Sequence, residues 1–543
     1  MLAGQAISSK SVHDQTTLVV RRSGVRGIDR SASPPLHGRR TGFRHEHGAV
    51  RIAARPSLLG LRLRHRRPCA PAGALPDVRL LRLGCAFCSA AGVVPTPGAG
   101  GAAPAGSAGR AMSRDGHTTL RLVEAAPRRL DDYRGIAPDE LLDESVALAA
   151  ALDGARVLQV NATPFGGGVA ELLASEVGLM RDLGVEAEWR VICPDADLFQ
   201  ATKRIHNAMQ GQRVGLDEHG LHTYLERNRH CAAMLGDEWD VIVVHDPQPA
   251  ALIASAAAPG AVWVWRCHID TSTPDPATWE LLRAFVLGYD AFVFTLPEFC
   301  PPDLDHARLE VIAPAIDPLT AKNRPLPRHL ARQILADQGI DLTRPLVVQV
   351  SRFDPWKDPL GVVAAWRLAR AELPGLQLAL VGSMADDDPE GFTIYDEVRA
   401  ATDGEPDCHL LTNLTGIGAL EVNAFQREAD IVVQKSLREG FGLTVSEALW
   451  KGTPVVGGDA GGIPLQLGAD GGLLVDDVEG CAAAIVRLLE DEPLADRLAN
   501  AGHEHVRREF LTPRLLRDDL ALYRTLLTQR HATAAEPAPA GVH

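Results

Sequence analysis

The chain has 543 residues, 46 % of them hydrophobic and 23 % charged, and a formal net charge of −14. This balance is typical of a folded globular protein and excludes a collagen, a coiled coil and a wholly disordered chain. Every apolar run is shorter than the roughly 18 uninterrupted residues of a membrane-spanning helix, so we expect no membrane span. At roughly 100–200 residues per domain, the length predicts two or three domains.

The charge is distributed unevenly along the chain. Residues 1–111 contain 17 of the 55 Lys and Arg residues and 4 of the 69 Asp and Glu residues, so their net charge is +13 and that of the remainder is −27. A body that acidic is not expected to bind nucleic acid through general electrostatic attraction. If it binds phosphate groups, a few cations must do so locally.

The nine cysteines are scattered, and most lie in or beside apolar stretches. This pattern favours buried thiols in a reducing compartment over a disulfide framework, so we expect a cytoplasmic protein. Cys85 and Cys88 form an isolated CxxC motif. A structural zinc site would need a second pair of ligands, so no zinc site is predicted there.

Residues 1–111 differ in character from the rest of the chain. They show no sustained helical or strand period, and arginine, proline, glycine and alanine dominate. Such a segment cannot bury enough apolar area to offset its ordering entropy, so we expect it to be disordered or wrongly assigned to the protein. Its three interpretations are an arginine-rich targeting peptide, a basic tail that binds an acidic partner, and a segment absent from the native protein.

We favour the third interpretation as a hypothesis, because arginine supplies 49 of the 55 basic residues. That bias indicates a GC-rich gene. Non-coding GC-rich DNA, when translated, gives sequences rich in arginine, alanine, glycine and proline, as residues 1–111 are. Met112 begins a sequence of ordinary character. Mass spectrometry of the native N-terminus tests this hypothesis, and peptides from residues 1–111 would contradict it.

After Met112, strand-like and helix-like segments alternate in two series. The first series has expected helices over 138–152 and 169–183 and expected strands at 155–161, 185–193, 240–245, 261–267 and 291–295. The first series ends around 313–325, and a second series of alternating segments follows. The second series has expected strands at 345–351, 376–381, 409–411, 431–434, 454–457 and 472–475.

This alternation predicts an α/β fold of two doubly wound, Rossmann-like domains that face each other across a cleft. Ligands on such sheets bind at the carboxyl ends of the strands. The expected parts are a first domain over 112–318, a second domain over 319–512, a last helix over 513–531 and a flexible tail over 532–543.

Two cations follow the first strand of the second series. Arg352 comes directly after the strand end, and Lys357 lies five residues further on. A planar guanidinium and a compact ammonium at a strand end favour a diphosphate clamp. The alternative is two ordinary ion pairs with Asp354 and Asp358.

Two glutamates, Glu439 and Glu447, are separated by seven residues. Gly440 and Gly442 allow a tight backbone turn between them, and a helix is expected to begin near Leu443 with its amides directed at an anion. Glu447 then lies one turn inside that helix, where its carboxylate can reach the cleft and accept hydrogen bonds from sugar hydroxyls. The alternative is an acid stabilised by the helix dipole.

A glycine-rich turn, Gly166-Gly167-Gly168, follows the first strand and precedes a helix. It lacks the GxxxxGK[ST] pattern, and Glu171 occupies the place of the last glycine of a GxGxxG pattern, so phosphate-loop and dinucleotide-binding functions are excluded. Two interpretations of this turn remain open. Its backbone amides approach a donor phosphate or an acceptor sugar, or it is a simple turn without a ligand.

The ordered set of Arg352, Lys357, the glutamate pair and the glycine-rich turn resembles the retaining nucleotide-sugar glycosyltransferases of the GT-B fold, family four. A narrower resemblance, over about residues 134–527, is to the trehalose glycosyltransferring synthases, which couple a nucleoside-diphosphate glucose to free glucose. It rests on the motifs at 161–171, 245–249, 265–270, 351–358 and 381–384.

The resemblance implies an acceptor-side first domain and a nucleotide-sugar-binding second domain. It places Arg352 and Lys357 on the donor diphosphate, Glu447 on the nucleotide ribose and Glu439 on the donor sugar. The residues expected to bind the donor are Gly167, Gly168, Lys435, Gly440, Phe441, Gly442, Leu443 and Glu447.

The resemblance also places His268 beside the donor sugar, near the reacting carbon, and we count it with Arg352, Lys357 and Glu439 as catalytic. A buried structural histidine is the alternative. His245 and Asp246 end another strand, and we assign them, with Asp270, to the acceptor glucose. Lys435 ends a strand and is expected to help the leaving phosphate.

The implied reaction retains the configuration of the donor sugar. Double displacement would need a carboxylate nucleophile, and no motif clearly supplies one. The resemblance implies same-face attack, with the leaving diphosphate taking the proton of the acceptor while Arg352, Lys357 and the amides near Leu443 stabilise the developing charge. No cofactor or metal is required. Mg²⁺ is compatible with this scheme but not implied by it, because Asp386–Asp388 has the character of a solvated loop.

The expected partners are NDP-glucose, glucose and trehalose, with no nucleic acid and no membrane. The resemblance allows a homodimer, and the sequence does not decide the oligomeric state. The rival interpretations are a retaining trehalose phosphorylase, a family-four transferase with another acceptor and a non-catalytic nucleotide-sugar sensor. Glu447 argues against the phosphorylase, because a ribose-binding carboxylate has no purpose without a nucleoside.

Overall fold

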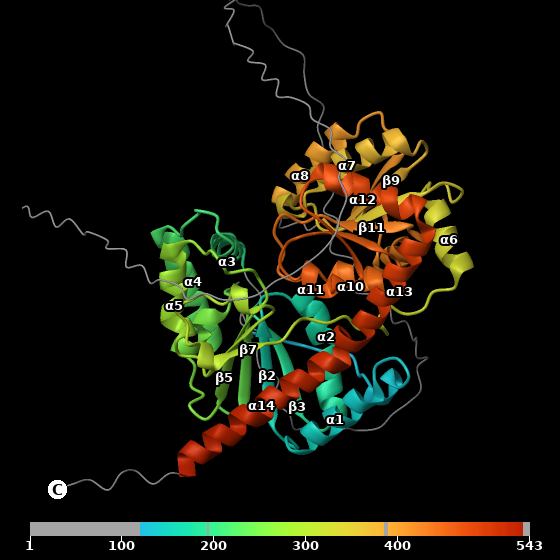
Figure 1. The fold of residues 1–543 in the computed structure, drawn as a ribbon. Helices are drawn as coiled ribbons and strands as arrows, with labels where there is room; N and C mark the ends of the chain where they lie inside the picture. Colours follow the sequence, from blue (N-terminus) through green and yellow to red (C-terminus); the bar gives the residue numbers. More distant parts are fainter. Residues whose placement is uncertain (1–119, 193–194, 385–388, 536–543) are drawn as a thin grey trace, which may run out of the picture. The chain divides into compact units, whose positions relative to one another are not determined.

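The computed structural model describes residues 120–192, 195–384 and 389–535. The expectations for residues 1–111, including Cys85 and Cys88, and for the loop at Asp386–Asp388 lie outside this part of the chain. The described residues form two α/β domains, each built on one sheet with helices on both faces (Figure 1). The prediction of two doubly wound domains is confirmed.

The N-terminal domain contains a seven-stranded sheet in the order β1-β3-β2-β4-β5-β6-β7. All neighbouring strands are parallel except β1, which pairs antiparallel with β3 at the edge. The strands are β1 (Arg121–Val123), β2 (Arg156–Asn161), β3 (Glu186–Val191), β4 (Val241–His245), β5 (Val262–Cys267), β6 (Ala291–Phe294) and β7 (Leu309–Val311).

Helices cover both faces of this sheet, which explains why the central strands are nearly continuous apolar runs. In β2, Val157 packs on one side, and Leu158 and Val160 pack on the other. The first side is covered by α1 (Asp139–Ala150), α2 (Gly168–Asp182) and α14 (Thr512–Ala535), and the second by α3 (Ala196–Met209), α4 (Glu218–Ala232) and α5 (Pro276–Val286).

The C-terminal domain contains a six-stranded parallel sheet in the order β10-β9-β8-β11-β12-β13. Its strands are β8 (Leu346–Val350), β9 (Gln377–Gly382), β10 (Cys408–Thr412), β11 (Ile431–Gln434), β12 (Val455–Gly458) and β13 (Gly472–Val475). One face is covered by α6 (Arg328–Asp337), α9 (Ala419–Glu428), α10 (Leu443–Trp450), α11 (Ile463–Leu467) and α13 (Glu492–Glu509), and the other by α7 (Pro359–Glu372), α8 (Pro389–Ala401) and α12 (Val478–Glu490).

The last helix returns to the N-terminal domain. α14 packs against α1 and α2 (Figure 1). Its residues Leu515, Leu516, Leu520 and Tyr523 are buried. It extends to Ala535, beyond its expected end at 531, so the first residues of the expected flexible tail are helical, and residues 536–543 lie outside the described part. Among the described segments, every helix is too short or too polar to span a bilayer.

Both sheets change winding direction at one place, and these places position the candidate site. The chain moves outward in opposite directions from β2 and β4 in the first sheet, and from β8 and β11 in the second. Loops at the carboxyl ends of such neighbouring strands diverge and leave room for a ligand. The glycine-rich turn follows β2, Asp246 follows β4, Arg352 follows β8 and Lys435 follows β11.

Candidate active site

Loops from the two domains touch at the strand ends. A Cβ atom at Gly440 would lie 2.3 Å from the carbonyl oxygen of His268, and one at Gly168 would lie 3.0 Å from the Cδ1 atom of Leu443. The loop after β11 therefore packs on the loop after β5, and the glycine-rich turn packs on the first residue of α10. The structure thus brings together motifs that the sequence places up to about 280 residues apart.

Lys357 and Glu439 form an ion pair, with 2.5 Å between Nζ and Oε2. Ser436 donates its hydroxyl to the same Glu439 oxygen at 3.2 Å. The Arg352 side chain is half exposed and lies 3.2 Å from Asp354, the partner named in the ion-pair alternative. That alternative is wrong for Lys357, because Asp358 instead pairs with Lys435.

Backbone conformation shapes the loop between β11 and α10. Gly442 has φ +85°, which glycine adopts without strain, and it forms the N-cap of α10 at Leu443, where the helix was expected to begin. The Phe441 ring is buried against Phe510, with 5.5 Å between ring centroids, so only its backbone is available to a ligand. Gly461 was not foreseen: a Cβ atom there would lie 1.7 Å from the carbonyl oxygen of Glu439. Such a contact across the fold leaves no signal in the local sequence.

Glu447 is completely buried, which corrects the expectation that its carboxylate reaches an open cleft. One carboxylate oxygen lies 3.2 Å from Nζ of Lys322, and the other accepts a hydrogen bond from Gln426 at 3.2 Å. Burial alone would raise the pKa of Glu447, but the charges of Lys322 and Lys451 outweigh it, so the pKa lies below its usual value. Lys322 also binds Glu171 on α2 at 2.7 Å, so it joins the two domains.

His245 and His268 form a hydrogen-bonded and stacked pair. Nδ1 of His245 lies 2.9 Å from Nε2 of His268, and Nε2 of His245 lies 2.8 Å from Oε1 of Gln159. Burial and then the charge of Arg266 lower the pKa of both rings well below the usual value. His245 is only 2 % exposed, so it lies behind His268 instead of facing the cleft as expected.

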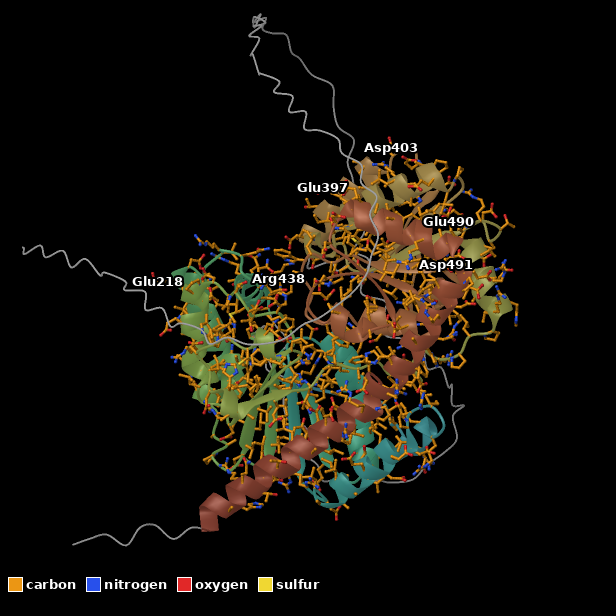
Figure 2. The ribbon with its side chains drawn as sticks, viewed as in Figure 1. Glu218, Glu397, Asp403, Arg438, Glu490 and Asp491 are labelled. Carbon is orange, nitrogen blue, oxygen red and sulfur yellow. The ribbon has the colours of Figure 1, made fainter. Side chains whose placement is uncertain are left out.

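Asp246 and Asp270 are each held by a protein partner. Asp246 has φ +65°, an uncommon conformation for aspartate, and its carboxylate accepts a hydrogen bond from the backbone N–H of His268 at 2.7 Å. Burial raises its pKa to about 7. Asp270 lies 2.8 Å from Nε of Arg438 in the C-terminal domain. Arg438 also reaches the carbonyl of Gln210, so this arginine is a link between the domains that the sequence did not indicate (Figure 2).

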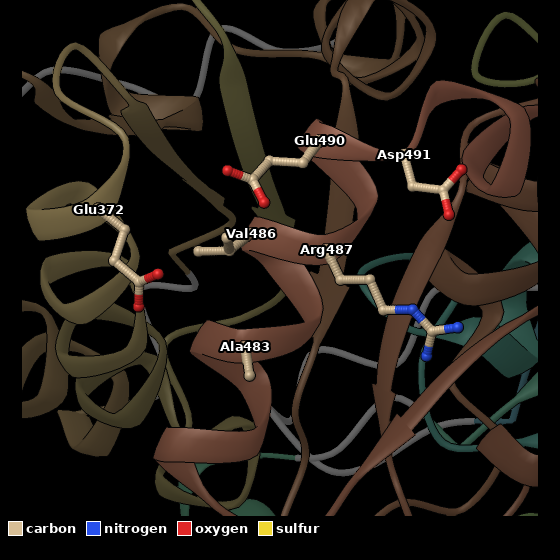
Figure 3. A pocket seen from close by; sticks show the side chains of 6 residues that line it. All are labelled: Glu372, Ala483, Val486, Arg487, Glu490 and Asp491. Atoms are coloured by element: carbon tan, nitrogen blue, oxygen red, sulfur yellow. The ribbon is translucent and has the colours of Figure 1, made fainter.

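A surface hollow of about 320 Å³ lies elsewhere on the C-terminal domain. Glu372 at the end of α7 and Glu490 at the end of α12 line it, together with Arg487 (Figure 3). Because a helix that follows a parallel strand runs back along the sheet, these helix ends lie at the edge opposite the candidate site. Among the described residues, no group of three or more His, Cys, Asp or Glu side chains is arranged to hold a metal ion.

The two doubly wound domains, with strand-end loops that meet, have the GT-B architecture known from glycosyltransferases. Residues 331–505 match the family described as "Glycosyl transferases group 1", and residues 159–301 match "Trehalose synthase, N-terminal domain". The crystal structure of α,α-trehalose 6-phosphate synthase from Burkholderia multivorans has the same fold, with a TM-score of 0.55 and 18 % identity over 72 % of this chain and 100 % of that chain.

Two relatives define the family more narrowly. The chain is 50 % identical to "Trehalose synthase" of Rubrobacter xylanophilus over 413 residues, which cover 75 % of this chain and 99 % of the relative. It is 42 % identical to "Trehalose synthase" of Pyrococcus horikoshii over 396 residues, which cover 72 % and 95 %. The chain belongs to the trehalose synthase family of glycosyltransferases.

Proposed function

We propose that this chain transfers a glucosyl group from NDP-glucose to free glucose with retention of configuration, giving α,α-trehalose, and that the same site also runs the reverse reaction. The observation that carries the proposal is the placement of Arg352, Lys357 and Lys435 at the ends of β8 and β11, beside a loop that contacts His268. The names of the relatives support trehalose as the product.

Binding of a diphosphate is proposed to exchange the partners of these lysines. Lys357 now binds Glu439, and Lys435 binds Asp358. A diphosphate offers each ammonium phosphate oxygens, and it leaves Glu439 able to accept hydrogen bonds from the donor sugar. Arg352 is half exposed beside them and supplies a planar pair of donors. The amides at the start of α10 add further donors.

The proposed chemistry occurs on one face of the donor sugar. The bond from the anomeric carbon to the diphosphate oxygen breaks, a bond to the acceptor hydroxyl oxygen forms, and the leaving diphosphate takes the acceptor proton. A covalent intermediate would need a carboxylate nucleophile. Asp246 is held by a backbone hydrogen bond and Asp270 by an ion pair, which supports the same-face route. No step of this scheme requires a metal ion.

The test is to incubate the full chain with labelled ADP-glucose or UDP-glucose and unlabelled glucose. We expect release of the nucleoside diphosphate and a non-reducing disaccharide that NMR identifies as α,α-trehalose. A product formed only from glucose 1-phosphate would instead establish a phosphorylase. Binding of the nucleotide sugar without turnover would establish a sensor, and either result would overturn the proposal.

A further inference from the structure

A chain of hydrogen bonds leads from the last helix to His268. Nε2 of Gln159 on β2 donates to the hydroxyl of Tyr523 on α14 at 3.1 Å. Oε1 of Gln159 lies 2.8 Å from Nε2 of His245, and Nδ1 of His245 lies 2.9 Å from Nε2 of His268. Gln159 is 1 % exposed in a strand of apolar neighbours. A buried amide needs such partners, because a buried polar group that loses its hydrogen bond destabilises the fold.

The direction of each hydrogen bond follows from the first. Because Gln159 donates to Tyr523 through its nitrogen, its oxygen is the atom that meets His245, so Nε2 of His245 carries a proton. In a neutral ring Nδ1 of His245 is then an acceptor, and Nε2 of His268 must donate to it. Nδ1 of His268 is left unprotonated. None of the described residues is hydrogen-bonded to that nitrogen, and the ring is only half-buried.

Both rings remain neutral for physical reasons. His245 is buried and His268 is half-buried, and both rings lie near the positive charge of Arg266. Burial and then this charge lower the pKa of each ring. Arg266 pairs with Asp519 at 2.6 Å, and Glu176 lies beside this pair. The Asp246 carboxylate accepts a hydrogen bond from the backbone N–H of His268. When both imidazoles are neutral, a single proton lies between Nδ1 of His245 and Nε2 of His268. The Gln159 amide, which bonds the other nitrogen of His245, decides which of the two carries that proton.

We propose that Gln159 is a positioning residue that fixes the tautomer of His268, so that His268 presents an unprotonated Nδ1 as a hydrogen-bond acceptor to a hydroxyl of a bound hexose. The tautomer rests on the hydrogen-bond geometry and on the neutrality of the two rings, whereas the role toward the sugar rests on the proposed function. A ring fixed in this way orients a sugar hydroxyl without donating a competing proton. It also explains why His245 is buried although it ends a strand at the site.

The test uses NMR of the full chain labelled with ¹⁵N in the histidine rings. The signals of His268 are identified by their loss in His268→Asn. We expect its Nε2 to have the shift of a protonated nitrogen and its Nδ1 that of an unprotonated one. In Gln159→Met, which keeps the volume and removes the acceptor, the preference should be lost. In Gln159→Glu, whose carboxylate still accepts from His245, it should be retained.

Gln377→Met is the matched control, because Gln377 is also 1 % exposed and bonds to Asp341 with both ends of its amide. It should lose stability without altering the His268 signals. For trehalose formation we expect Gln159→Met to lower kcat by about tenfold or more with a smaller change in KM, and Gln159→Glu to recover most of it.

A proton on Nδ1 of His268 in the unaltered chain, or identical His268 signals in Gln159→Met, would overturn the assignment. If the spectra agree but the chain makes no trehalose, the tautomer stands and the proposed function fails. If the spectra agree and Gln159→Met is as active as the unaltered chain, the positioning role is wrong.

Discussion

Lysine is rare in this chain, and its placement is informative. Only six lysines occur among 55 basic residues, and five of them lie in the described part. Lys322, Lys357, Lys435 and Lys451 each bind a carboxylate or a buried carbonyl group. A compact ammonium fits a narrow space where a planar guanidinium does not. Arginine therefore does not substitute freely at these four positions.

The first prediction concerns the two clamp cations. Lys357→Ala or Arg352→Ala should lower turnover more than about a hundredfold, because each donor stabilises the charge that develops on the leaving diphosphate. Steady-state kinetics measures the loss, and far-ultraviolet circular dichroism checks that the fold persists. Arg399→Ala, at a cation 68 % exposed on α8, should leave turnover unchanged. Near-normal rates in the clamp variants would remove the diphosphate clamp from the mechanism.

The second prediction concerns His206 on α3. Burial, with the charges of Arg352, Lys203 and Lys357, lowers its pKa to about 4, and its Nδ1 is buried without a hydrogen-bond partner among the described residues. The unfolded chain binds this proton near pH 6.5 and the folded chain only near pH 4, so stability should fall as the pH drops between these values. The expected contribution over this range is on the order of 3 kcal/mol, at about 1.4 kcal/mol per pKa unit.

Urea unfolding at pH 7, 5.5 and 4.5 measures this slope. His206→Asn should make it less steep, whereas a substitution of the exposed His306 to Asn should leave it unchanged. An equal slope in the His206 variant would show that the ring is already protonated or solvated in the folded chain.

Among the elements, the loop between β11 and α10 depends on close backbone packing. Gly440→Ala would place a Cβ atom 2.3 Å from the carbonyl oxygen of His268, and neither backbone can yield without moving the loop. We expect a loss of turnover of about a hundredfold with the fold intact, since a displacement near 1 Å at a reacting centre has that effect. Kinetics and thermal unfolding measured together separate the two effects.

Gly260→Ala is the matched control for this loop, because a Cβ atom there would meet nothing within 4 Å. Equal activity of the Gly440 and Gly260 variants would mean that the contact between the two loops is not needed for turnover.

The strands could be predicted from the sequence, but the partners of the site residues could not. Each predicted strand is present with ends shifted by at most two residues, because a strand covered on both faces is a readable apolar run. β1 and β7 were missed because each has three residues, largely exposed, at a sheet edge. The partners of Lys322, Arg438 and Gln159 lie far away in the sequence, so the spacing of residues in a motif could not predict these contacts. Burial of Glu447 and His245 is likewise a property of the assembled fold.

For the whole molecule, the bridge through Lys322 links α2 and α10. Its ammonium lies 2.7 Å from Glu171 and 3.2 Å from Glu447, which is completely buried. Lys322→Met should therefore lower the free energy of unfolding by about 3–5 kcal/mol, because it leaves a buried carboxylate without its main counter-charge. Chemical denaturation measures this change, and Glu447→Gln added to the same chain should restore much of the loss.

Lys203→Met is the matched control, because Lys203 has a similar exposure, 26 % against 23 %, and an exposed partner in Glu390 on α8. A change under about 1 kcal/mol is expected for it. If the Lys322 variant is no less stable than this control, Glu447 is protonated or rearranged in the folded chain.

The polypeptide passes from one domain to the other twice, and the two crossings lie side by side, since Ile316 and Leu511 form a β-bridge. The C-terminal helix α14 is therefore part of the N-terminal domain, although it comes last in the sequence. A fragment that stops before it would expose the apolar groove beside α1 and α2. Expression of the first half alone thus requires the last helix as an added peptide, whereas a circular permutant that joins the two could fold as a unit.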